Sequence, residues 1–354
     1  VVLQSRDGRS VIRNLRFALR PVLILGAVAL LVWSPWLAKN FLLTGNPTYP
    51  FFFDGIHWDD YRAWWYDRPG TGLAYTEPLR LLTAPWDMTI WGLEGRAGYS
   101  ATTGPLFLAI SPLIALMWTR FDPRQRAWLR GALGFCGVLY GFWLWGIARS
   151  ALLHQARLLL PVVGLFALML GGTVVELRMW NPYGIDFGWL VRAVVVTVLV
   201  LTLTGTLLDS IQGRPLQVLL GFEREEAFLR RRLGWHYAVI EHINRELPPN
   251  SVVQFLWEPR SYHCEVDCRP DALLDRWLHT THVLGHDAQA IVDHWREQGI
   301  THVLLYQTGY NMIREAGFDP VTLDDAAALR ELQDHHLRTA KEWDDVYVLY
   351  ELTP

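Results

Sequence analysis

A short polar turn brings Arg149, His154 and Arg157 between two long apolar stretches, residues 131–148 and 158–175. The arginines carry a permanent positive charge, and histidine titrates near neutral pH. Oriented cations of this kind stabilise an anion that is bound or that develops during a reaction. Because the flanking stretches are long enough to cross a bilayer, we expect this charge at a membrane surface.

Three carboxylates in a long aromatic loop, residues 39–96, are further candidates for chemistry. Asp59 and Asp60 are adjacent, and one of such a pair can act as a general base. Adjacent acids on a loop also serve as helix caps or as solvated charges, which is the alternative here. Asp87 is predicted to orient the loop through an Asx-type hydrogen bond, with substrate contact as its alternative.

Cys264 and Cys268 enclose three residues in the C-terminal part of the chain, where oxidising conditions would allow a disulfide. The spacing favours a disulfide, and reduced thiols or a metal pair are the alternatives. His279, His282 and His286 would share one helix face and could complete a zinc site with a cysteine. A glycine directly before His286 favours solvated histidines, so no cofactor is predicted and a divalent metal stays open.

Five long apolar stretches, which contain almost no charged residues, must position these side chains. Each approaches the roughly 20 residues needed to cross about 30 Å of hydrocarbon. Arg192 is the one charged residue within them, and it lies close enough to one end to snorkel. The sequence therefore predicts an α-helical polytopic membrane domain over residues 1–210, with spans at 21–38, 97–119, 131–148, 158–175 and 187–208.

The distribution of basic residues orients this domain. Five arginines and one acid precede the first span, and four arginines and one acid separate the second span from the third. The 39–96 loop instead has seven acids and five bases. The positive-inside rule puts the N-terminal end in the cytoplasm, and it puts the long loop and the C-terminal part outside the inner membrane. The arginines of the 149–157 turn then lie outside, against the trend.

Residues 211–354 have the composition of a small soluble domain. From Asp209 onward there are 24 acidic and 14 basic residues, a balance of −10, which disfavours nucleic acid as a partner. Apolar patterning predicts strands and helices in alternation, and hence an extracytoplasmic α/β domain. The predicted strands are 252–257, 302–306 and 347–352, and the predicted helices are 223–247, 288–298 and 323–335.

Four motifs occur in order around the predicted spans. They are Trp36-Leu-Ala-Lys-Asn40 with Thr44-Gly-Asn-Pro-Thr-Tyr-Pro-Phe-Phe52, Pro85-Trp-Asp-Met-Thr89, Gly104-Pro-Leu-Phe-Leu108, and Gln155-Ala-Arg-Leu-Leu-Leu-Pro161. Together they resemble the later half of bacterial GT-C superfamily glycosyltransferases, of the protein-mannosyltransferase and aminoarabinose-transferase type. The resemblance covers residues 15–210, and the C-terminal domain resembles one that such proteins often carry.

The resemblance implies an enzyme that transfers a sugar from a polyprenyl-phosphate carrier to a protein, lipid or glycan acceptor. It implies that Arg157, with His154 one turn earlier, contacts the donor phosphate. The alternatives are that Arg157 snorkels to membrane lipids and that His154 occupies a wet turn. The family has Arg-Tyr where this chain has Arg157-Leu158, which weakens the match.

The same resemblance places the catalytic carboxylate of the family in the first outer loop, near the start of the protein. The chain begins with Val-Val, and its first residues are typical of a cytoplasmic loop between helices, which predicts that it is part of a larger protein. We therefore expect the base N-terminal to this chain, with Asp59 and Asp60 as weaker candidates. The alternative function is a non-catalytic membrane scaffold with a degenerate transferase body.

Overall fold

The computed structural model describes residues 8–50, 55, 58–90, 104–177, 186–316 and 321–353. The chain divides into two compact units, Val1–Thr204 and Gly205–Pro354. We call them the membrane unit and the C-terminal unit. The division falls inside one helix, close to the boundary predicted at residue 210.

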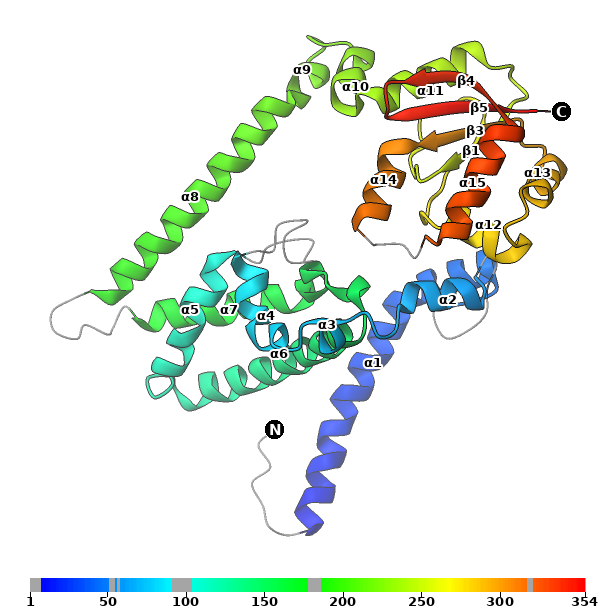
Figure 1. Cartoon of the computed structure of the whole chain (residues 1–354). Helices are drawn as coiled ribbons and strands as arrows, with labels where there is room; N and C mark the ends of the chain where they lie inside the picture. The colour runs from blue at the N-terminus through cyan, green and yellow to red at the C-terminus, as the bar shows by residue number, and fades with distance from the viewer. Residues whose placement is uncertain are drawn as a thin grey trace. The chain divides into compact units, whose positions relative to one another are not determined.

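The described elements of the membrane unit are helices, apart from an isolated bridge between Gly55 and Trp58 (Figure 1). Its long helices are connected by short α-helices and by 3₁₀ turns. The elements are α1 (Gly8–Thr44), α2 (Asp60–Asp67), α3 (Leu73–Thr76), α4 (Arg80–Ile90), α5 (Pro105–Leu116), α6 (Pro123–Arg149), η1 (Ala151–Leu153), η2 (Ala156–Leu159), α7 (Leu160–Glu176) and α8 (Phe187–Gly213).

Four helices in the described part of the chain are long and apolar enough to cross a membrane. These segments are Leu19–Thr44, Pro123–Arg149, Ala156–Glu176 and Phe187–Gly213, and they support a membrane protein with several spans. The predicted second span differs from the other four. Its described part forms only α5, which measures about 18 Å at 1.5 Å per residue. Residues 97–103 of that prediction lie outside the described residues, so five spans are not established.

Helices α5, α6 and α7 pack around one apolar core. Ile114 of α5, Cys136 of α6 and Met169 of α7 are all buried in it. A capping box of Asp122 with Gln125 begins α6, and the Gln125 amide also donates to Glu176 Oε1 at 2.9 Å. The start of α6 therefore meets the end of α7, and the two helices run antiparallel.

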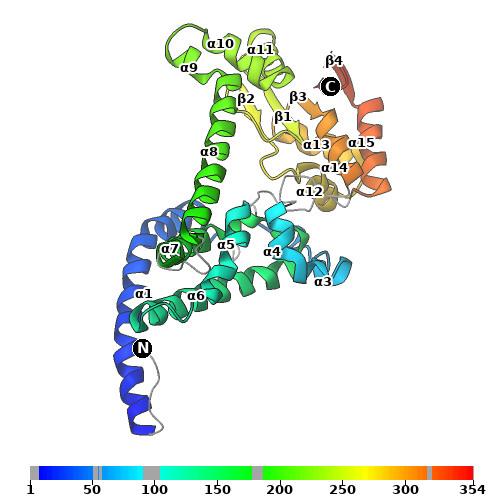
Figure 2. The ribbon, with the colours of Figure 1, turned by 90° about the vertical axis from the view of Figure 1, so that its left-hand side faces the viewer.

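The C-terminal unit is a layered α/β structure with a mixed five-stranded sheet of order β2-β1-β3-β5-β4 (Figures 1 and 2). β1 runs parallel to β2 and β3, and β5 runs antiparallel to β3 and β4. The elements are α9 (Pro215–Leu219), α10 (Glu225–Leu233), α11 (Trp235–Glu246), β1 (Val252–Leu256), β2 (Asp267–Arg269), α12 (Arg276–Leu284), α13 (Ala288–Glu297), β3 (His302–Tyr306), α14 (Gln307–Ala316), α15 (Leu323–His335), β4 (Leu337–Trp343) and β5 (Tyr347–Leu352).

Helices cover both faces of this sheet. Phe255 and Leu304 are paired in the ladder and pack against Ile240 of α11 on one face. On the other face, Gln333 of α15 donates to the Tyr350 hydroxyl at 2.9 Å. Coverage on both sides explains why successive residues of β1 and β3 are buried, rather than buried and exposed in alternation.

Candidate functional site

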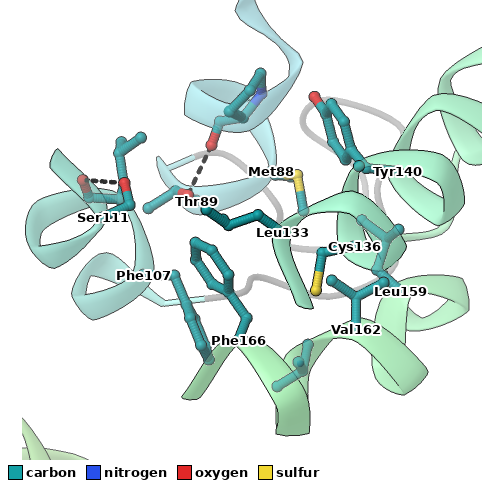
Figure 3. A pocket seen from close by; sticks show the side chains of 14 residues that line it. Met88, Thr89, Phe107, Ser111, Leu133, Cys136, Tyr140, Leu159, Val162 and Phe166 are labelled. Carbon is teal, nitrogen blue, oxygen red and sulfur yellow. Dashed lines mark hydrogen bonds between the residues drawn. The ribbon is translucent and has the colours of Figure 1, made fainter. Parts of the chain in front are cut away.

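An apolar cavity of about 340 Å³ lies between four helical elements of the membrane unit (Figure 3). Its size falls in the range of pockets that hold small molecules, roughly 300–1,000 Å³. The lining comes from α4, α5, α6 and the η2–α7 segment. The lining residues are Pro85, Met88, Thr89, Phe107, Leu108, Ser111, Leu133, Cys136, Gly137, Tyr140, Leu159, Val162, Val163 and Phe166.

Among the described residues that line the cavity, none carries a charged side chain. Thr89 Oγ1 donates to the Pro85 carbonyl at 2.7 Å, and Ser111 Oγ donates to the Leu108 carbonyl at 3.3 Å. Both hydroxyls are thus bonded back to their own helices, as expected in an apolar environment. The cavity suits a hydrocarbon chain better than it suits a sugar or a phosphate.

Arg157 lies on the same 3₁₀ turn, η2, that supplies Leu159 to the cavity. Its Nε donates to Gln155 Oε1 at 2.8 Å. Gln155 is itself fixed, because its amide donates to the Leu152 carbonyl and its own carbonyl accepts from Trp143 Nε1. Within the described residues, the two terminal guanidinium nitrogens of this exposed arginine have no acceptor. They form an oriented fork that matches phosphate geometry.

His154 lies in the same turn, partly buried, with Nε2 3.1 Å from the Ile147 carbonyl. Because a carbonyl only accepts, Nε2 carries the proton. Burial lowers the pKa of His154, and the charge of Arg80 acts in the same direction, against the Ile147 carbonyl and Glu77. His154 is therefore neutral at pH 7 and holds the turn against the end of α6. Contact between His154 and a phosphate stays a prediction.

Asp87 is buried inside helix α4, not in a loop. Its Oδ2 accepts from Thr83 Oγ1 at 2.9 Å and lies 3.4 Å from Arg80 Nε. Arg80 also pairs with Glu77 at 3.1 Å. The expected Asx-type bond is replaced by side-chain bonds along one helix face, at the i, i+4 and i, i+7 spacings. Sequence reasoning did not pair Asp87 with Arg80, because it placed Asp87 in a loop rather than inside a helix that continues to Ile90.

Gly72 lets the segment before α3 lie directly on the end of α6. Its amide and that of Gly70 both donate to the Arg149 carbonyl at 3.2 Å. A methyl group at Gly72 would come within 2.5 Å of backbone atoms of Ala148 and Arg149. This close approach holds α3 and α4 beside the turn that carries Arg157.

We expect Gly72→Ala to destabilise the membrane unit, because the new methyl group overlaps backbone atoms that cannot rotate away. Overpacking of this kind costs roughly 1–3 kcal/mol, which corresponds to an apparent unfolding temperature about 3–10 °C lower. Thermal unfolding of the full chain in detergent measures it. Gly131→Ala is the control, since a methyl group there meets no atom within 4 Å. Equal unfolding temperatures for the two variants would contradict the prediction.

Asp59 and Asp60 lie at the start of α2. Asp59 is the N-cap of this helix, and its Oδ1 accepts from the Arg62 amide at 2.9 Å. Asp60 follows in the first turn and is exposed. Neither residue is among those that line the apolar cavity. The structure therefore gives Asp59 a helix-capping role and does not bring the pair to the cavity.

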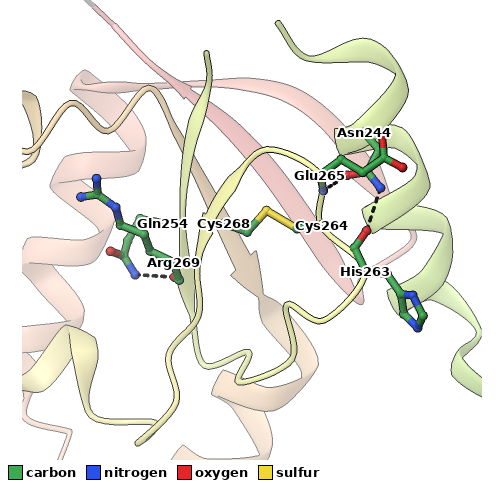
Figure 4. The surroundings of a disulfide bond; sticks show 7 residues. All are labelled: Asn244, Gln254, His263, Cys264, Glu265, Cys268 and Arg269. Carbon is green, nitrogen blue, oxygen red and sulfur yellow. Dashed lines mark hydrogen bonds between the residues drawn. A yellow bond between two sulfur atoms is a disulfide. The ribbon is translucent and has the colours of Figure 1, made fainter. Parts of the chain in front are cut away.

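Cys264 and Cys268 form a disulfide in the C-terminal unit (Figure 4). Asn244 of α11 holds the loop that this disulfide closes, because its amide donates to the His263 carbonyl at 2.8 Å and its Oδ1 accepts from the Glu265 amide at 2.9 Å. Cys268 belongs to β2, the edge strand of the sheet. The disulfide therefore ties the preceding loop to this strand, while Asn244 ties the same loop to α11.

The histidine-rich segment is built into helix α12 and the turn after it. His286 Nε2 lies 3.0 Å from Asp325 Oδ1, and Asp325 also accepts from Thr281. Burial raises the pKa of Asp325, but the bonds from Thr322, Thr281 and His286 lower it overall. Among the described residues, no group of three or more histidine, cysteine or acidic side chains could hold a metal ion.

A second polar cluster, in the C-terminal unit, escaped sequence reasoning. Glu258 follows β1, is fully buried, and accepts two bonds from the Arg260 guanidinium at 2.8 and 2.7 Å. Tyr347 donates to Glu258 Oε2 at 2.5 Å, and His236 Nδ1 lies 3.4 Å from the same oxygen. The only sequence signal was the Glu-x-Arg spacing, which is common. The cluster ties α11, β1 and β5 together.

Comparison of the chain with known protein families, curated proteins and solved structures finds no match. In the membrane unit, η2 joins two features, since it carries the exposed Arg157 and supplies Leu159 to the wall of the apolar cavity.

Proposed function

We propose that the chain is a membrane glycosyltransferase, or the C-terminal portion of one. It would transfer a sugar from a polyprenyl-phosphate carrier to an acceptor on the outer face of the inner membrane, with the N-terminal end cytoplasmic and the C-terminal unit outside. The observation that carries this proposal is the adjacency of Leu159 and Arg157 on η2. One turn supplies both the wall of an apolar cavity and a cation oriented by Gln155.

This pairing suits a lipid with an anionic head. The first isoprene units of the carrier would occupy the cavity, and the phosphate would lie against the guanidinium of Arg157. During transfer, the acceptor oxygen bonds to the anomeric carbon and the bond from that carbon to the phosphate oxygen breaks. Negative charge then develops on the departing phosphate, and a fixed cation stabilises that charge. A carboxylate base would take the acceptor proton.

The neighbouring residues have supporting roles in this proposal. Neutral His154, bonded to the Ile147 carbonyl, fixes the turn and so the direction of Arg157. Asp87 keeps Arg80 on α4 and so stiffens the helix that supplies Met88 to the cavity. Such preorganisation matters because the cation must already be in position when charge develops.

Filling the cavity tests the lipid-binding half of the proposal. We expect Gly137→Leu to weaken binding of a polyprenyl phosphate about tenfold or more, because overpacking an occupied site costs roughly 1–3 kcal/mol. Gly137 lines the cavity, and an added side chain would project into it. Native mass spectrometry of the full chain in lipid nanodiscs, titrated with the carrier, measures the affinity.

Gly134→Leu is the matched control for this experiment. It makes the same substitution on the same helix, but Gly134 does not line the cavity and has no atom within 4 Å of an added methyl group. Equal affinities in the two variants would exclude the cavity as the carrier site. Carrier binding without any transfer activity would instead favour the scaffold function.

A further inference from the structure

Exposed apolar side chains are concentrated directly after α8, in residues 215–222, which we call the interfacial segment. Leu216, Leu219, Leu220 and Phe222 are 65, 79, 65 and 82% exposed. We propose that this segment lies in the surface of the lipid bilayer on the side of the C-terminal unit, with these four side chains inserted among the lipids. Such insertion does not require that the chain transfer sugar.

The segment has the local geometry of an interfacial helix. Leu216, Leu219 and Leu220 follow the i, i+3, i+4 spacing, so they share one face of α9 and its last turn. Gly221 has φ +75° and ends the helix in a Schellman motif. In that motif the Phe222 amide donates to the Gln217 carbonyl at 2.8 Å. The aromatic ring is therefore held three residues beyond Leu219, the last residue of α9.

This apolar face is expected to contact the bilayer, because the segment directly follows a helix long enough to cross a membrane. α8 ends at Gly213. Arg214 follows with φ +51°, and Pro215 occupies the first position of the new helix, α9. Arg231 of α10 donates to the Gly213 carbonyl at 3.3 Å and to Glu223 Oε2 at 2.8 Å. Both ends of the interfacial segment are thus fastened at the end of α8, where the hydrocarbon core gives way to head groups.

Local charge agrees with a phospholipid surface, although the C-terminal unit as a whole is acidic. Between residues 214 and 232 there are five arginines and three glutamates. Among the described residues, Arg214, Arg224 and Arg232 have no acidic partner, and all three are exposed. Apolar side chains on one helix face with arginines beside them are typical of helices that lie in the interface. The guanidinium groups match the lipid phosphates.

Depth-dependent fluorescence quenching tests the proposal. Leu219→Cys and Phe222→Cys are labelled in the full chain with an environment-sensitive dye, after reconstitution into vesicles that contain brominated phospholipids. Leu323→Cys is the control, because Leu323 is equally exposed at 86% but lies on α15 of the same unit. We expect brominated lipids to quench the labels at 219 and 222 severalfold more than the label at 323.

A water-soluble quencher, iodide, distinguishes the remaining outcomes. We expect iodide to quench the label at 323 and to leave the labels at 219 and 222 largely unaffected. If iodide reaches all three positions equally, the segment is solvated and the proposal is wrong. Labels at 219 and 222 that are shielded from iodide but not quenched by brominated lipids would indicate a covering protein, which would also overturn it.

Discussion

Arg157→Ala is expected to reduce sugar transfer by roughly 10²–10³-fold, the loss that follows removal of one oriented group that stabilises a developing anion. The fold should survive, because Arg157 is exposed and the only hydrogen bond of its side chain within the described residues goes to Gln155. The measurement is turnover of a polyprenyl-phosphate sugar by the full-length protein, with circular dichroism as the check on folding. Normal turnover would remove Arg157 from the site.

Two further variants separate phosphate contact from simple attraction to lipid. Arg149→Ala removes the same charge at the same membrane surface, but its guanidinium lies over the Trp145 ring, 5.2 Å from the centroid. If Arg157 only snorkels to lipids, the two alanine variants should lose activity equally. Arg157→Lys keeps the charge but not the two-pronged geometry, so we expect it to recover activity only in part.

The second large effect is expected at Glu258 in the C-terminal unit. Burial alone would raise the pKa of Glu258, but bonds from Arg260, His236 and Tyr347 lower it to about 2. A carboxyl group whose pKa is about 2 in the folded chain instead of 4.5 contributes roughly 3 kcal/mol of stabilisation at neutral pH. Glu258→Gln removes this charge and should accelerate amide hydrogen exchange in β1 and β3 roughly 100-fold in the full chain.

The stabilisation by Glu258 is expected to decrease as the pH falls. A carboxylate with a lowered pKa stabilises the fold fully above pH 4.5, and this contribution is lost as the pH falls through about 2. The difference between wild type and Glu258→Gln should therefore shrink over that range. Glu265→Gln is the control, since Glu265 is exposed near the same strand. Equal exchange rates in the two variants at pH 7 would show that the buried cluster adds no stability.

The central strands of the C-terminal unit could be predicted from the sequence, and the edge strands could not. β3 and β5 have the predicted bounds because they are apolar runs buried in the sheet. β2 has only three residues, and β4 exposes all of its residues between Leu337 and Trp343. Without a buried face, neither edge strand leaves a periodic signal.

Local backbone geometry explains the helices that were predicted wrongly. The expected helix over 223–247 is two helices, α10 and α11, because Gly234 adopts φ +55° between them. Within the expected 39–96 loop, the chain forms the helices α3 and α4, which flank Pro78. Asp87, which was expected in a loop, lies inside α4, because Pro85 does not end that helix.

The charged residues of the candidate site could be predicted from the sequence, and the cavity could not. Charge in the turn between two apolar stretches drew attention to Arg157 and His154, and both lie in the short connection between α6 and α7. The cavity beside them left no such signal. Its walls come from four elements between Pro85 and Phe166, and only tertiary packing decides whether apolar residues fill the space between helices or leave it open.

The small loop closed by Cys264 and Cys268 has a practical meaning for anyone who produces this protein. A crosslink over so few residues removes little entropy from the unfolded chain, and the chain-entropy model gives a stabilisation of about 2 kcal/mol. The stabilisation expected from this bond is therefore at the low end of the range for protein disulfides. Cytosolic expression in a reducing strain would yield free thiols at both positions, whereas export would yield the cystine.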